Sequence, residues 1–527
     1  MCSPNFPERS ELPPLRTSSN GTMIVIIGTS SLNNLDFAGL VSSLVSIRRE
    51  NSFEASNKIN LHVVKITKIV STISGVLMSQ LVALHANGAV VFTNLFSFNQ
   101  TNGASPNAGL IQGKDGNFYG TTFSGGPATY GTNGTIFQIT SLGVFTNLIA
   151  FNSTNGAGPR AALLQGADGN FYGTTYYGGT NNAGTVFQYF TNGTLNTLVT
   201  FAFSDGTGAY PIAGLIQGAD GSFYGTTAIG GTNGFGAIFK LATNGVFSTL
   251  VSFDNTNGAS PYAGLVQAND GNLYGTTYLG GTNAGSGTIF KLATNGAFTS
   301  LYSFSGTNDG ANPYAGTIQG ADGNFYGTTF YGGSNNYGTV FKFATNGALT
   351  TLVSFDNTNG AYPQASVIQA SDGNLYGTTS SGGAYTNEAG LGYGTIFELT
   401  TNGTLTTLIS FNGTNGAFPK AGLIQGTDGN FYGTTSSGGT NGYGTIFQLG
   451  VIVPAPRFLT ETKMGSTLTL TWSATVGQNY QILYKTNLAQ TVWSNLNNSI
   501  TATNPTMTTP DTIGPDPQRF YRILLLP

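Results

Sequence analysis

The chain has 527 residues and a formal net charge of -3, with 18 Lys and Arg against 21 Asp and Glu, and only 7% of its residues are charged. This balance excludes a general electrostatic attraction to nucleic acid, and we expect no nucleic-acid partner. The one cysteine and the two histidines lie within the first 85 residues. A single cysteine cannot form a disulfide framework within the chain. Because no histidine follows residue 85, His-based catalysis and His-based metal binding are excluded from the rest of the chain. We therefore expect neither a metal nor another cofactor.

The N-terminal 86 residues contain no repeat. Residues 1–62 are expected to be disordered or, through a later start codon, not translated. Two lysines then precede an apolar run over residues 69–84, and the small Ala86 ends it. This order is typical of a secretory signal peptide, here residues 63–86, and predicts an exported protein without a membrane span in its mature form. The alternative is a translated extension followed by one anchor helix.

An octapeptide, DGNFYGTT with small variations, dominates the rest of the chain. It occurs seven times at intervals of 50 to 56 residues. Its copies begin at Asp115, Asp168, Asp220, Asp270, Asp322, Asp372 and Asp428. A fixed period of this size indicates a solenoid, a propeller or another repeat array.

Each repeat contains four short segments with the composition of β-strands. In the copies near the end of the chain they read AGLIQ, NFYGTT, GTIFQL and TLTTLISF, and we call them strands A to D. They are rich in Thr, Ile, Phe and Tyr and are bounded by Gly, Asn and Asp. Asp-Gly in the A–B link and Asn-Gly in the C–D link predict tight hairpins. Four antiparallel strands in about fifty residues is the size of one propeller blade.

The two ends of the repeat region complement each other. The last repeat runs through strand C to Leu449 and has no strand D, whereas residues 90–98 precede the first repeat and match a strand D. An N-terminal strand that completes the last blade would close the ring and leave no free sheet edge. The sequence therefore predicts an all-β protein whose residues 87–450 form a seven-bladed β-propeller of four-stranded blades. A β-solenoid or another array is the alternative.

The residues of the octapeptide fit a structural role in a β-hairpin. Asp-Gly suits the A–B turn, and Phe and Tyr suit a strand whose faces alternate. The Gly of YGTT leaves room for a neighbouring backbone or ring. The alternative is a cation site at each Asp, although each turn has one carboxylate and Ca²⁺ takes several oxygen ligands.

The order DG-N-F/L-YGTT, then GG, then GT-I/V-F resembles the GloVer tandem repeat, found in proteins described as choice-of-anchor. The resemblance covers residues 86–449. It implies a secreted or surface-displayed bacterial protein and supplies no activity, substrate or catalytic residue. No sorting signal typical of an anchored protein is recognisable at the C-terminus.

The C-terminal region differs from the repeats. After a Pro-punctuated linker over residues 451–456, residues 457–527 contain both tryptophans, Trp472 and Trp493. Alternating segments in this region predict a small β-sandwich, and they resemble fibronectin-type or immunoglobulin-like modules. Trp472 fits the core of such a sandwich, and a platform for stacking sugars is the alternative.

Variable residues gather in the loops at one end of the predicted blades, where binding sites are usually carried. Each D–A loop ends in Pro and one residue that differs between repeats, and the B–C loops add aromatic residues. If strand A is innermost, the residues after Pro surround the mouth of the channel. Tyr rings beside Arg, Lys and amides suit sugars or peptides. The candidate ligand-binding residues are Arg160, Tyr262, Tyr314, Gln364 and Lys420. The alternative is that these side chains only cap the core.

The sequence thus favours a secreted or cell-surface propeller without enzymatic activity, which recognises an extracellular polysaccharide or a surface protein. One alternative is a carbohydrate-active enzyme, a glycoside hydrolase or lyase, that uses two loop carboxylates. The loop carboxylates from which such a pair could come are Asp205, Asp254, Asp309, Asp356 and Glu388. Another alternative is a structural display module without a ligand. Lys240, Lys291 and Lys342 are interpreted as solvated strand positions.

Overall fold

A computed structural model of the chain describes residues 23–26, 90–127, 133–203, 205–283, 285–451, 456–475, 478–487, 489–513 and 518–526. The chain divides into two compact units, one formed by residues 90–450 and the other by residues 1–89 with 451–527. Every regular element within the described ranges is a β-strand, and none of them contains a helix long and apolar enough to cross a membrane. The predicted signal peptide over residues 63–86 lies outside the described residues.

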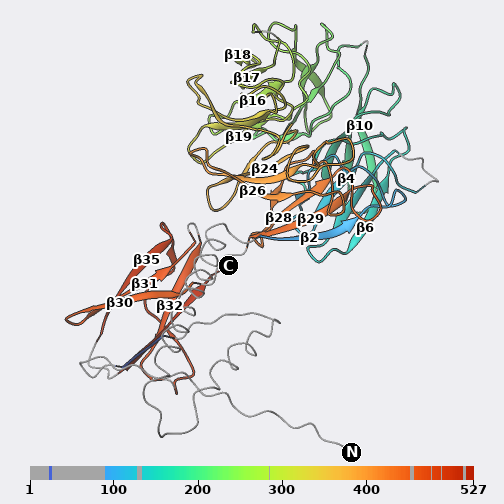
Figure 1. The fold of residues 1–527 in the computed structure, drawn as a ribbon. Helices are drawn as coiled ribbons and strands as arrows, with labels where there is room; N and C mark the ends of the chain where they lie inside the picture. The colour runs from blue at the N-terminus through green and yellow to red at the C-terminus, as the bar shows by residue number, and fades with distance from the viewer. Residues whose placement is uncertain are drawn as a thin grey trace, which may run out of the picture. The chain divides into compact units, whose positions relative to one another are not determined.

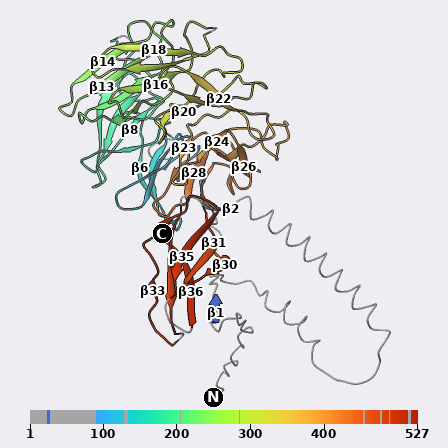
Figure 2. The ribbon, with the colours of Figure 1, turned by 90° about the vertical axis from the view of Figure 1, so that its left-hand side faces the viewer.

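Residues 90–450 form seven four-stranded antiparallel sheets (Figures 1 and 2). Each sheet contains one copy of the octapeptide, and we number the repeat sheets 1 to 7 in that order. The all-β, propeller-like architecture predicted from the sequence is confirmed at this level. Hairpins connect strands A and B in every sheet, and strands C and D in sheets 1 to 6, at one end of the sheet. The D–A and B–C loops lie at the other end, which we call the loop end.

The four strand positions recur in every repeat sheet. Strands A are β3 (Ile111–Gln112), β7 (Leu164–Gln165), β11 (Ile216–Gln217), β15 (Val266–Gln267), β19 (Ile318–Gln319), β23 (Ile368–Gln369) and β27 (Ile424–Gln425). Strands B are β4 (Phe118–Thr122), β8 (Phe171–Thr175), β12 (Phe223–Thr227), β16 (Leu273–Thr277), β20 (Phe325–Thr329), β24 (Leu375–Thr379) and β28 (Phe431–Thr435). Strands C are β5 (Thr135–Ile139), β9 (Thr185–Tyr189), β13 (Ala237–Leu241), β17 (Thr288–Leu292), β21 (Thr339–Phe343), β25 (Thr395–Leu399) and β29 (Thr445–Val451). Strands D are β6 (Phe145–Ala150), β10 (Leu195–Thr200), β14 (Phe247–Ser252), β18 (Phe298–Ser303), β22 (Leu349–Ser354), β26 (Leu405–Ser410) and, in sheet 7, β2 (Val90–Ser97).

Strand A is shorter than predicted, because its first residues contact the neighbouring sheet. In sheet 1 only Ile111–Gln112 pairs with strand B. The carbonyl of Ala108 instead accepts a hydrogen bond of 3.0 Å from the hydroxyl of Thr434 in sheet 7. A Cβ on Gly109 would lie 3.5 Å from the carbonyl oxygen of Gly422. The residues before Ile111 therefore contact the neighbouring sheet instead of pairing with strand B, and the predicted strand boundary was wrong.

Sheet 7 combines the two ends of the repeat region. Its strand order is β2-β29-β28-β27, so β2 occupies the position of strand D. Phe98, directly after β2, is fully buried, and its amide donates a hydrogen bond of 3.0 Å to the carbonyl of Gly444. Phe92 stacks on Phe447 with ring centroids 5.3 Å apart. The N-terminal strand thus supplies what the C-terminal repeat lacks.

The Asp of the octapeptide fastens its own hairpin. In sheet 1 the Oδ1 atom of Asp115 accepts a hydrogen bond of 3.2 Å from the amide of Asn117, and the Oδ2 atom accepts one of 2.7 Å from the hydroxyl of Tyr119. The bond from the Tyr hydroxyl to Asp recurs in all seven repeat sheets at 2.7 to 2.9 Å. The interpretation of the octapeptide as a hairpin is confirmed, and the Tyr hydroxyl as partner of the Asp was missed.

The Gln that ends strand A joins each sheet to its neighbour. Its Nε2 atom donates a hydrogen bond to the carbonyl of the Gly that directly follows the octapeptide Asp in its own hairpin. Its Oε1 atom accepts a hydrogen bond of 2.8 to 3.0 Å from the adjacent sheet, from the amide that precedes the octapeptide Asp. The donor and acceptor residues are Lys114 and Gln165, Ala167 and Gln217, Ala219 and Gln267, Asn269 and Gln319, Ala321 and Gln369, Ser371 and Gln425, and Thr427 and Gln112. The last pair links sheet 7 to sheet 1.

Packing requires the Gly of YGTT. A Cβ on Gly433 would lie 2.5 Å from the Cζ atom of Phe447 on strand C, and Phe447 is fully buried. The preceding Tyr packs on the next sheet, as where the rings of Tyr172 and Phe223 have centroids 4.2 Å apart. Each copy of the octapeptide therefore closes its hairpin and contacts its neighbour, which explains why it is repeated in every sheet.

The three strand-C lysines are ion-paired, which corrects their interpretation as merely solvated positions. Lys240, Lys291 and Lys342 lie 2.8, 3.2 and 2.8 Å from the octapeptide Asp of their own sheets. Burial would raise the pKa of Asp220, but hydrogen bonds from Lys240 and Tyr224 outweigh it and lower that pKa to about 2. Where strand C carries Gln instead, as in sheets 1, 2 and 7, its amide donates to the same Tyr hydroxyl.

The second unit contains two packed sheets. One has the order β1-β36-β32-β33 with β34 also paired to β32, and the other has the order β30-β31-β35. The strands are β1 (Met23–Ile26), β30 (Phe458–Met464), β31 (Thr467–Ser473), β32 (Asn479–Lys485), β33 (Ser494–Asn495), β34 (Ile500–Thr501), β35 (Thr506–Thr512) and β36 (Gln518–Leu525). Side chains from both sheets share one core. The parallel pairing of β1 with β36 is not predicted by the sequence, which assigns residues 1–62 no structure.

Trp472 belongs to this shared core. Its side chain is fully buried, and its ring centroid lies 5.0 Å from that of Tyr480. The indole Nε1 atom donates a hydrogen bond of 3.1 Å to the Oγ1 atom of Thr509. The interpretation as a core residue is confirmed, and the alternative of a sugar platform is wrong for this side chain.

Candidate functional site

A strained residue before the proline fixes each D–A loop. In six repeat sheets this residue has a φ of 51 to 58° although it is not glycine. The six are Ser105, Tyr210, Ser260, Asn312, Tyr362 and Phe418, and Gly158 takes the same position in sheet 2 with a φ of 61°. Such a backbone costs about 1–3 kcal/mol and persists only where the surrounding structure enforces it.

Two backbone hydrogen bonds enforce this conformation. The amide of Tyr362 donates a bond of 2.8 Å to the carbonyl of Tyr337, in the B–C loop of sheet 5. The carbonyl of Tyr362 accepts a bond of 3.3 Å from the amide of Ser380, in the B–C loop of sheet 6. The equivalent pair of bonds occurs in all seven repeat sheets. The variable residue after each proline therefore stands on a frame that links neighbouring sheets.

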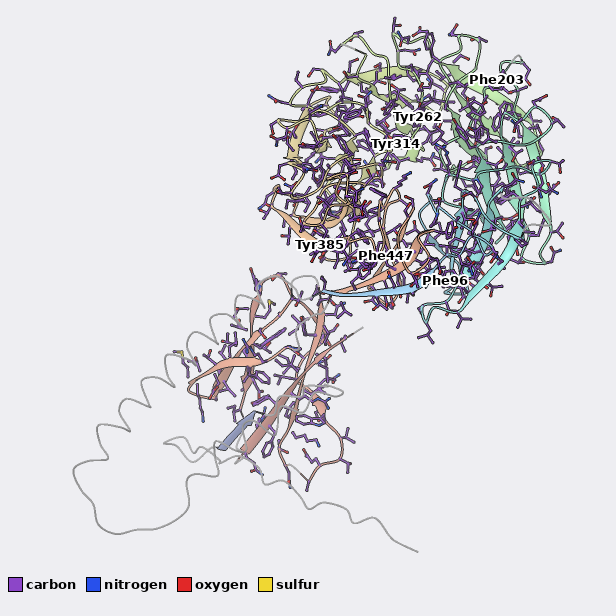
Figure 3. All side chains as sticks on the ribbon, turned by 45° about the vertical axis from the view of Figure 1, so that its right-hand side comes forward. Phe96, Phe203, Tyr262, Tyr314, Tyr385 and Phe447 are labelled. Atoms are coloured by element: carbon purple, nitrogen blue, oxygen red, sulfur yellow. The ribbon has the colours of Figure 1, made fainter. Side chains whose placement is uncertain are left out.

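Four aromatic residues of sheets 4 and 5 form one cluster on this frame. Tyr262 stacks on Tyr278 with ring centroids 4.8 Å apart and meets Tyr314 edge-on at 5.4 Å. Tyr314 also lies 6.2 Å from the ring of Phe330. Figure 3 shows Tyr262 and Tyr314 close together on the inner side of the ring of sheets. We call these four residues the aromatic cluster.

Arg160 of sheet 2 is held by aromatic rings rather than by a carboxylate. Its Cζ atom lies 4.8 Å from the ring centroid of Phe123 and 4.2 Å from that of Tyr176. Its Nε atom is buried without a hydrogen-bond partner. Burial raises the pKa of Tyr314, and the positive charge and a hydrogen bond of Arg160 offset part of that rise. Arg160 therefore reaches the aromatic cluster from a sheet that is not adjacent to it.

Lys420 of sheet 7 supplies a second positive charge near Arg160. Burial lowers the pKa of the Lys420 ammonium, and repulsion from Arg160 lowers it further. Neither cation belongs to any of the ion pairs within the described residues. Gln364, in contrast, donates a hydrogen bond of 3.2 Å to the hydroxyl of Ser380 in its own sheet.

The five predicted site residues thus fall into two groups. Contacts and charge interactions link Arg160, Tyr262, Tyr314 and Lys420, whereas the contact of Gln364 is local. The sequence analysis missed Tyr210 and Tyr362, which precede the loop prolines. The ring of Tyr210 stacks on Tyr176 at 4.8 Å, and that of Tyr362 stacks on Phe330 at 5.2 Å. An aromatic residue directly before each of these prolines was the available signal.

Four of the five loop carboxylates considered for catalysis serve their own loops. Asp254 accepts a hydrogen bond of 2.9 Å from the amide of Asn257, and Asp356 accepts one of the same length from the amide of Asn359. These bonds lower the pKa of both carboxyl groups. A general acid of a glycosidase needs the opposite shift. Asp205 likewise caps its loop, because it accepts a hydrogen bond of 2.9 Å from the amide of Thr207. The side chain of Glu388 is exposed.

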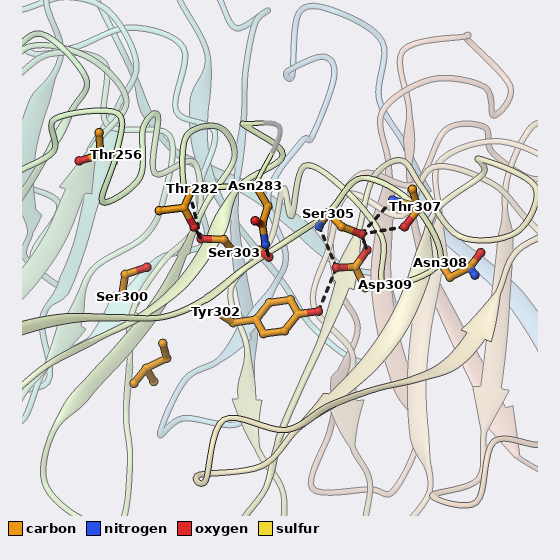
Figure 4. A pocket seen from close by; sticks show the side chains of 11 residues that line it. Thr256, Thr282, Asn283, Ser300, Tyr302, Ser303, Ser305, Thr307, Asn308 and Asp309 are labelled. Carbon is orange, nitrogen blue, oxygen red and sulfur yellow. Dashed lines mark hydrogen bonds between the residues drawn. The ribbon is translucent and has the colours of Figure 1, made fainter.

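A polar hollow of about 610 Å³ lies beside β18 of sheet 4 (Figure 4). It is lined by Thr256, Thr282, Asn283, Ser300, Leu301, Tyr302, Ser303, Ser305, Thr307, Asn308 and Asp309. Asp309 accepts hydrogen bonds of 2.9 Å from the hydroxyl of Tyr302 and 2.8 Å from the amide of Ser305. Burial, and then the bond to Asp309, raise the pKa of Tyr302 to about 12. The carboxylate of Asp309 thus organises this loop as the other loop carboxylates organise theirs.

Hollows also occur between neighbouring sheets at the hairpin end. One of about 370 Å³ between sheets 3 and 4 is lined by Asp220, Tyr224 and Lys240 among others, and a hollow of about 490 Å³ lies between sheets 2 and 3. Asp220, Tyr224 and Lys240 already bind one another. Two of the buried polar atoms without a hydrogen-bond partner, Arg160 Nε and Asn107 Oδ1, lie at the loop end. Within the described residues, no group of three His, Cys, Asp or Glu side chains is placed to hold a metal ion.

Comparison with known proteins identifies the repeat. The family model described as the Gloeobacter/Verrucomicrobia repeat matches residues 79–286 and 266–490. No curated protein matches the chain. The solved BP39L lectin from Burkholderia pseudomallei is 10% identical, with a TM-score of 0.44 over 66% of this chain and 99% of the lectin. Puromycin hydrolase is 10% identical, with a TM-score of 0.44 over 72% of this chain and 60% of the hydrolase.

Proposed function

The chain belongs to the Gloeobacter/Verrucomicrobia repeat family, and from that premise we propose that it is a secreted or cell-surface binding protein whose repeat sheets form a closed seven-bladed β-propeller. The propeller acts as a scaffold without enzymatic activity. Its loop end recognises an extracellular polysaccharide, and a surface protein is the alternative ligand. The two packed sheets of the second unit are a fibronectin-type or immunoglobulin-like module.

Contacts between the first and last repeat sheets support closure. The amide of Thr427 in sheet 7 donates a bond of 2.9 Å to the Oε1 atom of Gln112 in sheet 1, the same contact that joins the other neighbouring sheets. The bond between Thr434 and Ala108 at 3.0 Å likewise repeats a contact between successive sheets. A ring in which sheet 7 meets sheet 1 as sheet 1 meets sheet 2 needs no terminal cap.

The aromatic cluster is the observation that carries the proposed binding function. Tyr262 and Tyr314 are only half-buried, and their rings are fixed against one another on a frame of clamped loops. Half-exposed Tyr rings present apolar faces to the C–H groups of a pyranose, and their hydroxyls can bind sugar hydroxyls at low entropic cost. Asp205, Asp254, Asp309 and Asp356 are bound by their own loops, which favours binding over glycosidic catalysis.

Replacing both Tyr262 and Tyr314 by Ala is expected to weaken polysaccharide binding by about 1–3 kcal/mol, because buried aromatic contacts at the centre of a site carry much of its binding energy. A ligand found by screening the full chain on an array of extracellular polysaccharides serves for the titration, with isothermal calorimetry as the measurement. Tyr385→Ala is the matched control, since Tyr385 is 53% exposed and lies outside the aromatic cluster. The Tyr385→Ala variant should bind the polysaccharide with the same affinity as the parent.

Two results would contradict this assignment. If the double variant binds like the parent while Lys240→Gln at the hairpin end weakens binding, the proposed face is wrong. If no polysaccharide binds but a surface protein does, the alternative ligand replaces the proposed one. Melting temperatures of all variants should stay close to that of the parent, which separates binding from folding.

Export is supported by the order of lysines, apolar residues and Ala86 over residues 63–86. The native protein is therefore expected to begin near Asn87. Mass spectrometry of its N-terminal peptide measures this directly. A native N-terminus upstream of residue 60 would overturn both cleavage and the later start.

A further inference from the structure

We propose that the loop end binds an anionic sugar, a uronate, whose carboxylate lies between Arg160 and Lys420 and whose ring lies against the aromatic cluster. The inference rests on the binding function proposed above and adds the charge class of the ligand.

Arg160 has the properties of an anion-binding residue. The rings of Phe123 and Tyr176 hold its guanidinium at 4.8 and 4.2 Å, and these contacts use the faces of the rings rather than acceptors for its N–H groups. Its buried Nε atom has no hydrogen-bond partner. A buried donor of a charged group is costly when it is unpaired, and a carboxylate oxygen is the acceptor that the planar guanidinium fits best. The site is thus preorganised for an oxygen anion.

Lys420 makes the same region electropositive. Lys420 follows the loop proline of sheet 7 as Arg160 follows that of sheet 2, and the positive charge of Arg160 adds to burial in lowering the pKa of its ammonium. Both side chains are half-buried, and no carboxylate within the described residues forms an ion pair with either. Two partly desolvated cations without a counter-ion destabilise the free protein, and one anion between them relieves both costs.

Different sheets contribute the polar and the aromatic groups of the loop end. Sheets 7, 1 and 2 contribute Lys420, Asn107 and Arg160, while sheets 4 and 5 contribute Tyr262 and Tyr314. The Oδ1 atom of Asn107 is buried without a partner and can accept a bond from a sugar hydroxyl. A uronate matches all three features with its carboxylate, its hydroxyls and its apolar ring face. A neutral sugar would leave both cations unpaired.

The test compares oligogalacturonate with its methyl ester, which has the same sugar backbone and no charge. We expect the full chain to bind the acid about tenfold or more tightly than the ester, as the loss of a charge-assisted hydrogen bond implies. Arg160→Gln and Lys420→Gln should each reduce affinity for the acid about tenfold and leave affinity for the ester unchanged. Lys240→Gln is the control, because this lysine is paired with Asp220 at the hairpin end, and its affinity should match the parent.

The outcomes separate this inference from the binding function beneath it. Equal binding of acid and ester, or full affinity in both Gln variants, overturns the uronate assignment. Tighter binding of dextran sulfate or polyphosphate than of oligogalacturonate, with the same loss in Arg160→Gln, replaces the uronate by a sulfate or phosphate ester. If no polyanion binds, the inference fails. A neutral glycan that still requires Tyr262 and Tyr314 would leave the proposed function standing.

Discussion

A chain that lacks residues 87–98 is expected to aggregate or to lose cooperative unfolding of its repeat unit. The deletion removes β2 and uncovers the edge of β29, so that unpaired backbone groups face solvent. It also removes Phe98, which is fully buried in a cluster with Phe137 and Ile446. Loss of one buried Phe side chain costs about 3–5 kcal/mol, a large part of the 5–15 kcal/mol that stabilises a typical domain. Calorimetry and size-exclusion chromatography measure the effect.

A synthetic peptide with the sequence of residues 87–98 provides the matched control. Added to the shortened chain, it should restore solubility and a cooperative transition, because it can pair with β29 and insert Phe98. A scrambled peptide of the same composition should not. If the shortened chain melts and dissolves like the parent, β2 does not close the ring.

Trp472→Ala is expected to destabilise the second unit by about 3–5 kcal/mol, the usual cost of removing a large aromatic side chain from a core. Trp472 packs against Tyr480, and its indole donates to Thr509. The repeat unit should keep its own transition, because its core clusters contain no residue of the second unit. Calorimetry would then show a lowered transition for the second unit and an unchanged transition for the repeat unit. Chemical denaturation would likewise show one shifted step and one constant step.

Trp493→Ala is the matched control for this substitution. Trp493 is half-buried, and the ammonium of Lys485 lies 4.9 Å from its ring centroid. A cation–π contact near the surface stabilises by about 0.5–1 kcal/mol, so the control should shift the transition less than Trp472→Ala does. Equal effects of the two substitutions would contradict the assignment of Trp472 to the core.

The repeat architecture could be predicted because its signals are local. Asp-Gly and Asn-Gly mark hairpins wherever they occur, and strands of Phe, Tyr, Thr and Ile between them leave few alternatives. The length of strand A could not be predicted, because Ala108 and Gly109 contact another sheet instead of extending their own. The bond from Tyr119 to Asp115 depends on the register of one hairpin and on which face of the strand the Tyr occupies. Both outcomes are decided by tertiary contacts.

In the candidate site, too, local features could be predicted from the sequence and tertiary contacts could not. The residues after the loop prolines were identified from their variability, but the left-handed backbone of Tyr362 was not, since bulky residues rarely adopt it. Two hydrogen bonds to neighbouring loops enforce it. The interaction of Arg160 with Tyr314 joins repeats that are distant in the chain, and no local pattern relates them. Such pairs become visible only once the sheets are arranged in space.

The pairing of β2 with β29 determines where the repeat unit is attached to the rest of the chain. The amide of Phe98 binds the carbonyl of Gly444 near the loop end, whereas Gly450 lies near the carbonyl of Val91 at the other end of the same pair of strands. The chain therefore enters and leaves the unit through one sheet and at the hairpin end. Both points of attachment lie at the end of sheet 7 opposite the loop end, which carries Arg160, Tyr262 and Tyr314.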